Sequence, residues 1–116
     1  MPIAQIIVAP HVAPTIAAEA EQLAASLKTA LVQGLSTDPR LVQVTIIVAL
    51  CPPEGCATLC LVHHRASEVR TAKIREATAR RLHDILRDRT GGTVRVRLIA
   101  TELAHIAAYD SPEVLS

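Results

Sequence analysis

The first half of the chain alternates between two spacings of apolar residues. Residues 3–8 form an apolar run that only Gln5 interrupts, which is typical of a strand with both faces largely buried. Residues 15–34 carry apolar side chains at steps of three and four positions, which predicts an amphipathic helix. Residues 42–48 alternate β-branched apolar side chains with polar ones and predict a second strand.

The second half repeats this order after a connection that cannot continue a strand. In residues 51–55, two prolines remove backbone donors and a glycine permits a turn. Residues 56–62 are a short apolar run, residues 67–89 have helical spacing amid charges, and residues 94–99 alternate like a strand. Residues 103–116 form a tail. The pattern therefore predicts two consecutive β-α-β units.

Both predicted helices carry end signals. We expect Thr15 to cap the first helix, Glu19 to favour its first turn, and Gly34 to take the left-handed conformation just past its end. The pair Gly91-Gly92 ends the second helix in the same way.

Composition limits the class of protein. The chain has 116 residues, half of them hydrophobic, but a single aromatic residue, so its core must consist of Ala, Val, Leu and Ile. This length suits one domain, residues 1–116, with a pseudo-repeat of residues 1–54 and 55–116. The apolar excess in so small a chain indicates surface buried between subunits, and we expect a homo-oligomer. The net charge of +1 offers no electrostatic footprint for nucleic acid or an anionic membrane, so we expect neither partner.

The cysteines and the apolar segments bear on metal binding and location. Cys51, Cys56 and Cys60 have spacings that match neither a zinc-binding pair nor a redox motif, and we interpret them as free thiols. No histidine stands at a spacing typical of a metal site, so we expect no metal. The longest apolar stretches are only as long as strands, so we expect neither a signal peptide nor a transmembrane helix. These features predict a cytoplasmic protein.

Pro2 is the residue with the clearest chemical potential. A small residue after Met1 permits removal of the methionine, which would leave a secondary amine at the chain terminus. An α-amino group titrates near ~8, and burial beside cations lowers that pKa further, so the amine can accept a proton at neutral pH. The alternative is that proline at position two, a common residue there, has no role.

The segment Pro2-Ile3-Ala4-Gln5-Ile6 resembles the N-terminus of 4-oxalocrotonate tautomerase, the founder of the tautomerase superfamily. The second half resembles another copy of the same short unit. The matching segments there are His64-Arg65, Lys73-Ile74-Arg75-Glu76-Ala77, Thr93-Val94-Arg95-Val96 and Thr101-Glu102-Leu103-Ala104. The chain is thus similar to superfamily members made of two fused units, such as macrophage migration inhibitory factor and 5-carboxymethyl-2-hydroxymuconate isomerase.

The resemblance implies an active site with an N-terminal proline and two arginines. In the short members, one arginine follows the first strand and another lies early in the second strand, and both hold the carboxylate and carbonyl oxygens of the substrate. These positions fall on Arg65 and Arg95. The first half has no arginine at either place, and the second half has Gly55 in place of Pro2. Because the two losses are complementary, we expect Pro2, Arg65 and Arg95 to form one shared site.

Other residues could bind substrate. Strand alternation puts Arg97 on the same face as Arg95, and Arg70 stands five residues beyond Arg65, so either could add a cation. His64 adjoins Arg65, although a buried or solvated histidine is the alternative. Tyr109 falls near the place where family members have an aromatic ring, but its hydroxyl could equally have no role.

The resemblance implies an α/β (α+β) tautomerase-like fold, in which two β-α-β units form a four-stranded sheet with both helices on one face, assembled as a trimer. It also implies a cofactor-independent isomerase that catalyses enol-keto proton transfer on a small 2-hydroxy-2-enoate or α-keto acid, with Pro2 as base. The substrate would be a small anionic carboxylate.

Two alternatives stand beside this interpretation. Hydration-dependent dehalogenation or decarboxylation of a small unsaturated acid would need a water activator, for which Glu102, Tyr109 and Asp110 are the nearby candidates. A non-catalytic small-molecule-binding oligomer is the other, because ferredoxin-like domains have the same order of elements. Parallel pairing of the two strands within each half would distinguish the tautomerase unit from the antiparallel ferredoxin-like sheet.

Overall fold

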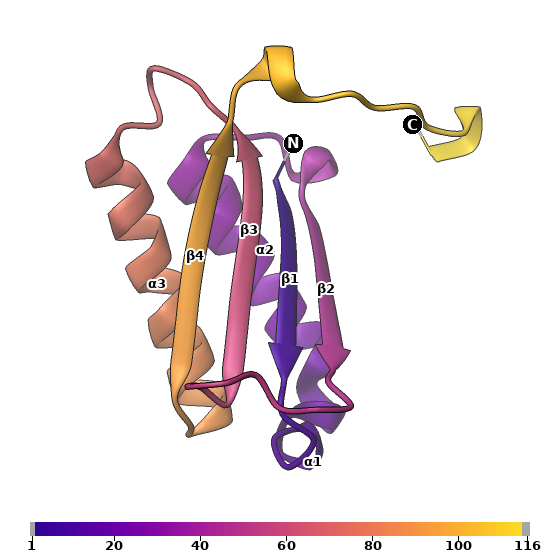
Figure 1. The fold of residues 1–116 in the computed structure, drawn as a ribbon, viewed down its shortest axis with the longest axis vertical. Helices are drawn as coiled ribbons and strands as arrows, with labels where there is room; N and C mark the ends of the chain where they lie inside the picture. Colours follow the sequence, from indigo (N-terminus) through magenta and orange to yellow (C-terminus); the bar gives the residue numbers. More distant parts are fainter. Residues whose placement is uncertain (1, 115–116) are drawn as a thin grey trace.

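A four-stranded mixed sheet organises residues 2–114, which are the residues that this computed structural model describes (Figure 1). Its strands are β1 (Ile3–Val8), β2 (Gln43–Val48), β3 (Thr58–Arg65) and β4 (Val94–Thr101). They lie in the order β2-β1-β3-β4, with β1 parallel to β2, β3 parallel to β4, and β1 antiparallel to β3. Parallel pairing within each half confirms the two β-α-β units and excludes the ferredoxin-like arrangement.

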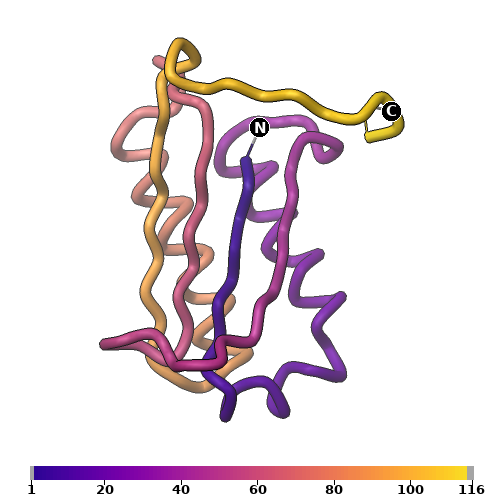
Figure 2. Tube along the Cα trace, turned by 45° about the vertical axis from the view of Figure 1, so that its right-hand side comes forward, coloured from indigo at the N-terminus to yellow at the C-terminus, as the bar shows by residue number. Residues whose placement is uncertain are grey.

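Helices cover one face of this sheet. The chain after β1 forms α1 (Ala13–Ile16), a 3-10 turn η1 (Ala17–Glu19) and α2 (Ala20–Leu35), and α3 (Ala72–Thr90) connects β3 to β4. α2 and α3 pack side by side on the same face (Figures 1 and 2). Three further 3-10 turns lie outside this layer: η2 (Pro39–Leu41), η3 (Leu103–His105) and η4 (Pro112–Val114).

The core between the sheet and the helices is aliphatic, as the composition requires. Alternate residues of β1 are buried because successive side chains of a strand point to opposite faces. Ile6 of β1 and Leu27 and Leu31 of α2 are fully enclosed. The opposite face has no helix over it among residues 2–114, and it exposes apolar side chains such as Ile3 and Ile99. None of the described helices is long and apolar enough to cross a membrane.

The start of the first helix differs from the sequence prediction. The helix begins at Ala13 rather than after Thr15, and its N-cap, Val12, makes no side-chain capping bond. Pro14 lies in the first turn, where a fixed φ suits a helix and the missing N–H costs nothing, so the chain enters the helix early. Thr15 is therefore inside α1 and caps nothing.

The end of α2 also differs, and the reason is packing. The helix continues through Gly34, and Ser36 takes the left-handed conformation with φ of 51°. A Cβ at Gly34 would overlap the side chain of Thr78 on α3, so this glycine permits the close approach of the two helices. The side chain of Thr78 is buried in this contact, whereas Ile74 of the same helix is 39% exposed.

The second helix ends as predicted but begins later. Gly91 takes the left-handed conformation with φ of 70°, and its N–H donates to the carbonyl of Arg87. At the other end, Thr71 caps the helix by accepting from the Ile74 N–H at 3.3 Å. Ser67 lies before this cap, in a turn that the Arg70 N–H closes by donating to the Ser67 carbonyl at 3.1 Å.

We expect Gly34→Ala to lower the free energy of unfolding by about 1–3 kcal/mol, because the new methyl group overpacks the helix interface. Chemical denaturation measures the change. In a Thr78→Ala background, which removes the atoms nearest to the new methyl, the same substitution should cost much less. Equal costs in the two backgrounds would contradict the packing role of Gly34.

Candidate functional site

A cavity of about 680 Å³ opens at the end of the sheet where β1 begins and β3 and β4 end. Five segments build its wall: the start of β1, residues 37–41, the end of β3 with the loop to α3, the end of β4, and the tail. The lining residues are Ile3, Thr37, Leu41, His63, His64, Arg65, Arg70, Thr101, Leu103, His105, Ile106, Ala107 and Ala108.

Pro2 adjoins this cavity but is not one of its lining residues. It directly precedes Ile3, which lines the cavity, and its own side chain is fully buried. Its carbonyl accepts a hydrogen bond from the Gln43 N–H at 3.0 Å, which extends the β1–β2 pairing to the first described residue. The expected removal of Met1 concerns a residue outside the described range.

His64 and Arg65 end β3 beside Pro2. His64 is only 3% exposed, and its Nδ1 lies 3.0 Å from the carbonyl oxygen of Arg65. Because that oxygen can only accept, Nδ1 carries the proton and Nε2 is the unprotonated nitrogen. Burial, together with the charges of Arg70 and Arg75, lowers the pKa of His64, so the imidazole is neutral at pH 7.

Arg70 is fixed by backbone carbonyls on two elements. Its Nε donates to Leu35 O at the end of α2 at 3.1 Å, and its Nη1 donates to Arg65 O at 2.8 Å. Its own carbonyl accepts from Arg75 Nη1 at 3.1 Å. Burial lowers the pKa of Arg70, but a guanidinium stays charged at any working pH. The half-buried guanidinium therefore contributes a fixed positive charge to the cavity.

The lining is cationic. Arg65 and Arg70 carry permanent charges, while no Asp or Glu of residues 2–114 lines the cavity. Arg65 is exposed, so its guanidinium is free to reach a bound group. A planar fork of this kind pairs with a carboxylate through two parallel hydrogen bonds. The cavity is suited to a small anion held next to Pro2.

Arg95 and Arg97 lie away from this cavity. In the sheet, Arg95 is the partner of Leu59. Ile99 is the partner of His63, which is itself the partner of Ile3. This separation of four residues corresponds to about 13 Å along β4, and β4 is two strands away from β1. Within one chain the structure brings Pro2, His64, Arg65 and Arg70 together and leaves Arg95 and Arg97 apart from them.

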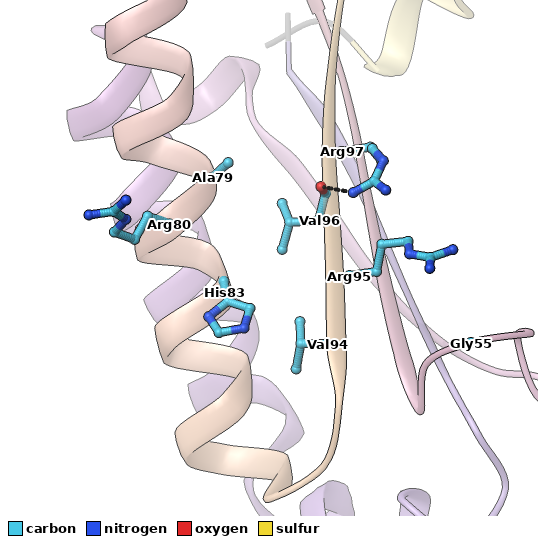
Figure 3. Close-up of a pocket in the computed structure, with 8 residues that line it drawn as sticks. All are labelled: Gly55, Ala79, Arg80, His83, Val94, Arg95, Val96 and Arg97. Atoms are coloured by element: carbon cyan, nitrogen blue, oxygen red, sulfur yellow. Dashed lines mark hydrogen bonds between the residues drawn. The ribbon is translucent and has the colours of Figure 1, made fainter.

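A second hollow of about 470 Å³ runs along β4, as Figure 3 shows. Arg95 and Arg97 point away from α3, while Arg80 points off the other side of the helix, so the three cations do not converge. Arg97 Nη1 donates a hydrogen bond to the carbonyl of Val96 at 2.9 Å. A Cβ at Gly55 would lie 3.2 Å from Arg95 Nη2, so Arg95 rests against the connection between the two units.

The tail contributes Leu103 and also Ile106, which sequence reasoning missed. It leaves β4 and crosses the end of the sheet toward β2, as Figure 2 shows. Leu103 and Ile106 line the cavity, and their three-residue spacing in an otherwise patternless tail was the available signal. Tyr109 lies just beyond the last lining residue and is 98% exposed, so it forms no part of the cavity wall in one chain.

The cysteines lie outside the cavity. All three are free, with Cys51 exposed and Cys60 buried. Burial raises the pKa of the Cys60 thiol to about 12, so it is not a nucleophile at neutral pH. Among residues 2–114, no group of three or more His, Cys, Asp or Glu side chains is arranged to hold a metal ion.

No family model matches the chain, and no curated protein matches it either. Solved structures do match. A fused 4-OT, a wild-type symmetric trimer, has a TM-score of 0.68 and 17% identity, covering 91% of this chain and 90% of its own. The protein Pt0534, inactivated by 2-oxo-3-pentynoate, has a TM-score of 0.67 and 19% identity over 91% and 90%. A macrophage migration inhibitory factor-like protein from Entamoeba histolytica has a TM-score of 0.66 and 12% identity over 94% and 95%.

The chain has the fold of 4-OT and of the migration inhibitory factor-like protein. The likeness to 4-OT and to migration inhibitory factor covers almost the whole chain, including both β-α-β units. This confirms the fold that the short segment after Met1 and the repeated second half implied.

The neutral state of His64 predicts how stability depends on pH. Because its pKa lies below the usual 6.5, the unfolded chain binds a proton here at a higher pH than the folded protein. This contribution to stability is complete above about pH 6.5 and is lost as the pH falls further. We expect His64→Gln to reduce the loss of unfolding free energy between about pH 7.5 and about pH 5.

Denaturation curves at both pH values measure this difference. The matched control is His11→Gln, because His11 is exposed at the opposite end of β1. Parallel pH profiles for the wild type and His64→Gln would show that His64 does not titrate differently in the folded state.

Proposed function

We propose that this protein is a cofactor-independent tautomerase that moves a proton between the enol and keto forms of a small 2-hydroxy-2-enoate or 2-oxo acid. The observation that carries the proposal is the position of Pro2, buried at the edge of a cationic cavity without a lining carboxylate. Removal of Met1 makes its nitrogen a secondary amine. The cations beside it lower the pKa of such an amine, so it is unprotonated often enough to act as base at neutral pH.

The reaction needs only one base and fixed positive charge. The Pro2 nitrogen takes the proton of the 2-hydroxyl group, the oxygen electrons form the carbonyl, and the double bond shifts. The proton on nitrogen then returns to carbon, so atoms and charge balance without a cofactor. Arg65 and Arg70 hold the substrate carboxylate and stabilise the negative charge that develops on oxygen.

The lining of this cavity also bears on the two alternatives, hydration chemistry and a purely binding role. Hydration chemistry needs a group that activates water, and Glu102, Tyr109 and Asp110 are all exposed and outside the cavity lining. A purely binding role would use the cations but would not need a free amine at Pro2. Pt0534, which has the same fold, is inactivated by 2-oxo-3-pentynoate, a small 2-oxo acid of the substrate class proposed here.

We also propose that the active assembly is a homotrimer in which Arg95 of a neighbouring copy completes the site. The similar fused 4-OT is a symmetric trimer. In this chain, β4 forms one edge of the sheet, and Arg95 and Arg97 are exposed on the face that no described helix covers. A second copy packed on that face would meet both guanidiniums.

The first test is Pro2→Ala, with removal of Met1 verified by mass. We expect the rate of ketonisation of 2-hydroxymuconate or phenylenolpyruvate, followed by ultraviolet absorbance, to fall about 10²-fold or more. Pro10→Ala, a change of an exposed proline just after β1, is the matched control and should keep the wild-type rate. An unchanged rate in Pro2→Ala would refute the role of Pro2.

Two further readouts separate the alternatives. 2-Oxo-3-pentynoate should add to the N-terminal peptide, and peptide mapping is needed because the exposed thiol of Cys51 can also react. Chloride release from a 3-chloroacrylate isomer, with no ketonisation, would instead support the hydration chemistry. Binding of a 2-oxo acid with neither activity would support a non-catalytic role.

Subunit mixing tests the shared site. Pro2→Ala and Arg95→Ala should each be nearly inactive, but refolding them together should restore about one quarter of the wild-type activity, because subunits exchange at random. The matched control mixes Pro2→Ala with Arg65→Ala, which should restore nothing because Pro2 and Arg65 lie in the same chain. Recovery in neither mixture, with trimers re-formed, would contradict the role of Arg95 across subunits.

A further inference from the structure

His64 lies directly across the sheet from Pro2. Ile3 is the partner of His63 in the antiparallel register of β1 and β3, so the next step places Pro2 opposite His64. Alternation puts Pro2 and His64 on the helix-covered face, where both are buried, while Ile3 and His63 are exposed on the other face. Opposed residues in such a pair have Cβ atoms about 5 Å apart.

The imidazole of His64 has an acceptor that no group of residues 2–114 uses. With Nδ1 donating to Arg65 O, Nε2 keeps a lone pair, and this atom is buried with no hydrogen-bond partner in residues 2–114. Buried polar atoms in folded proteins are seldom left in this state. The missing partner must be a donor, and the amide nitrogen of an internal proline has no hydrogen to give.

We propose that His64 Nε2 accepts a hydrogen bond from the Pro2 amine once Met1 is removed, and that His64 is thereby the positioning residue of the base. The inference rests on the proposed function, since it needs the free amine. A secondary amine has one N–H and one lone pair. Holding the N–H on His64 leaves the lone pair for the substrate.

The positive charge around the Pro2 amine explains why a neutral acceptor suits the position of His64. The cavity lining contributes Arg65, Arg70, His63 and His105, and Arg75 adds its charge from α3. The three guanidiniums oppose the protonated amine, and no carboxylate of residues 2–114 lines the cavity to balance them. Nε2 stabilises the protonated amine without adding a negative charge that would compete with the substrate carboxylate.

The test measures the pKa of the Pro2 amine directly, by nitrogen NMR titration of full-length protein with Met1 removed. In His64→Leu we expect this pKa to fall by about one unit, because the ammonium loses its acceptor. His64→Gln places an acceptor near the position of Nε2 and should restore most of the wild-type value. The exposed control His11→Gln should change nothing. The acid limb of kcat/KM should move with the amine pKa.

A second measurement needs no substitution at His64. In the wild-type chain with an uncleaved N-terminal extension, the Pro2 nitrogen is an amide without a hydrogen. The Nε2 resonance of His64 should therefore differ between the extended and the processed protein, which keeps the proposal testable even where His64→Leu fails to fold. An identical resonance in both forms would overturn the proposal.

Other outcomes are equally decisive. An amine pKa that is unchanged in His64→Leu, or that falls as far in His64→Gln as in His64→Leu, would overturn the hydrogen bond. Both measurements are made without substrate, so they are independent of turnover. A responsive amine in a protein that ketonises nothing would support this bond and reject the proposed function, whereas proline-dependent turnover with an unresponsive amine would do the reverse.

Discussion

The antiparallel pairing of β1 with β3 is the contact on which the rest of the structure depends. It joins the two β-α-β units into one sheet and places the beginning of β1 beside the end of β3. If the central strands ran parallel, Pro2 and Arg65 would lie at opposite ends of the sheet, about 20 Å apart. The candidate site therefore exists because the two units meet in opposite directions.

Two electrostatic requirements oppose each other in the cavity where the two units meet. In the proposed reaction, cations hold an anionic substrate, and the same cations make a protonated amine less stable beside them. Arg70, held by the carbonyls of Leu35 and Arg65, fixes this balance, because its charge cannot move away from the cavity. In the proposal, the neutral imidazole of His64 compensates by accepting a hydrogen bond from the amine, and it leaves the positive potential of the cavity intact.

The spacing of apolar residues predicted every strand and both long helices, because one buried face imposes a period of two on strands and of 3.6 on helices. Two predictions of helix ends were wrong, for different reasons. Gly34 is a residue typical of a helix stop, but it serves the contact with Thr78 on the other helix, which local sequence does not show. The error at Thr15 is local, because the preceding residue, Pro14, starts the helix earlier.

For the site, the sequence by itself determined which candidate groups the chain offers: a proline at position two, and guanidiniums at the end of the third strand and in the fourth. Only the tertiary structure decided their grouping. The strand register placed His64 and Arg65 beside Pro2 and separated Arg95 from them by several residues along β4. The path of the tail left Tyr109 outside the cavity. Residue type is a local property, whereas register and long-range packing depend on the whole sheet.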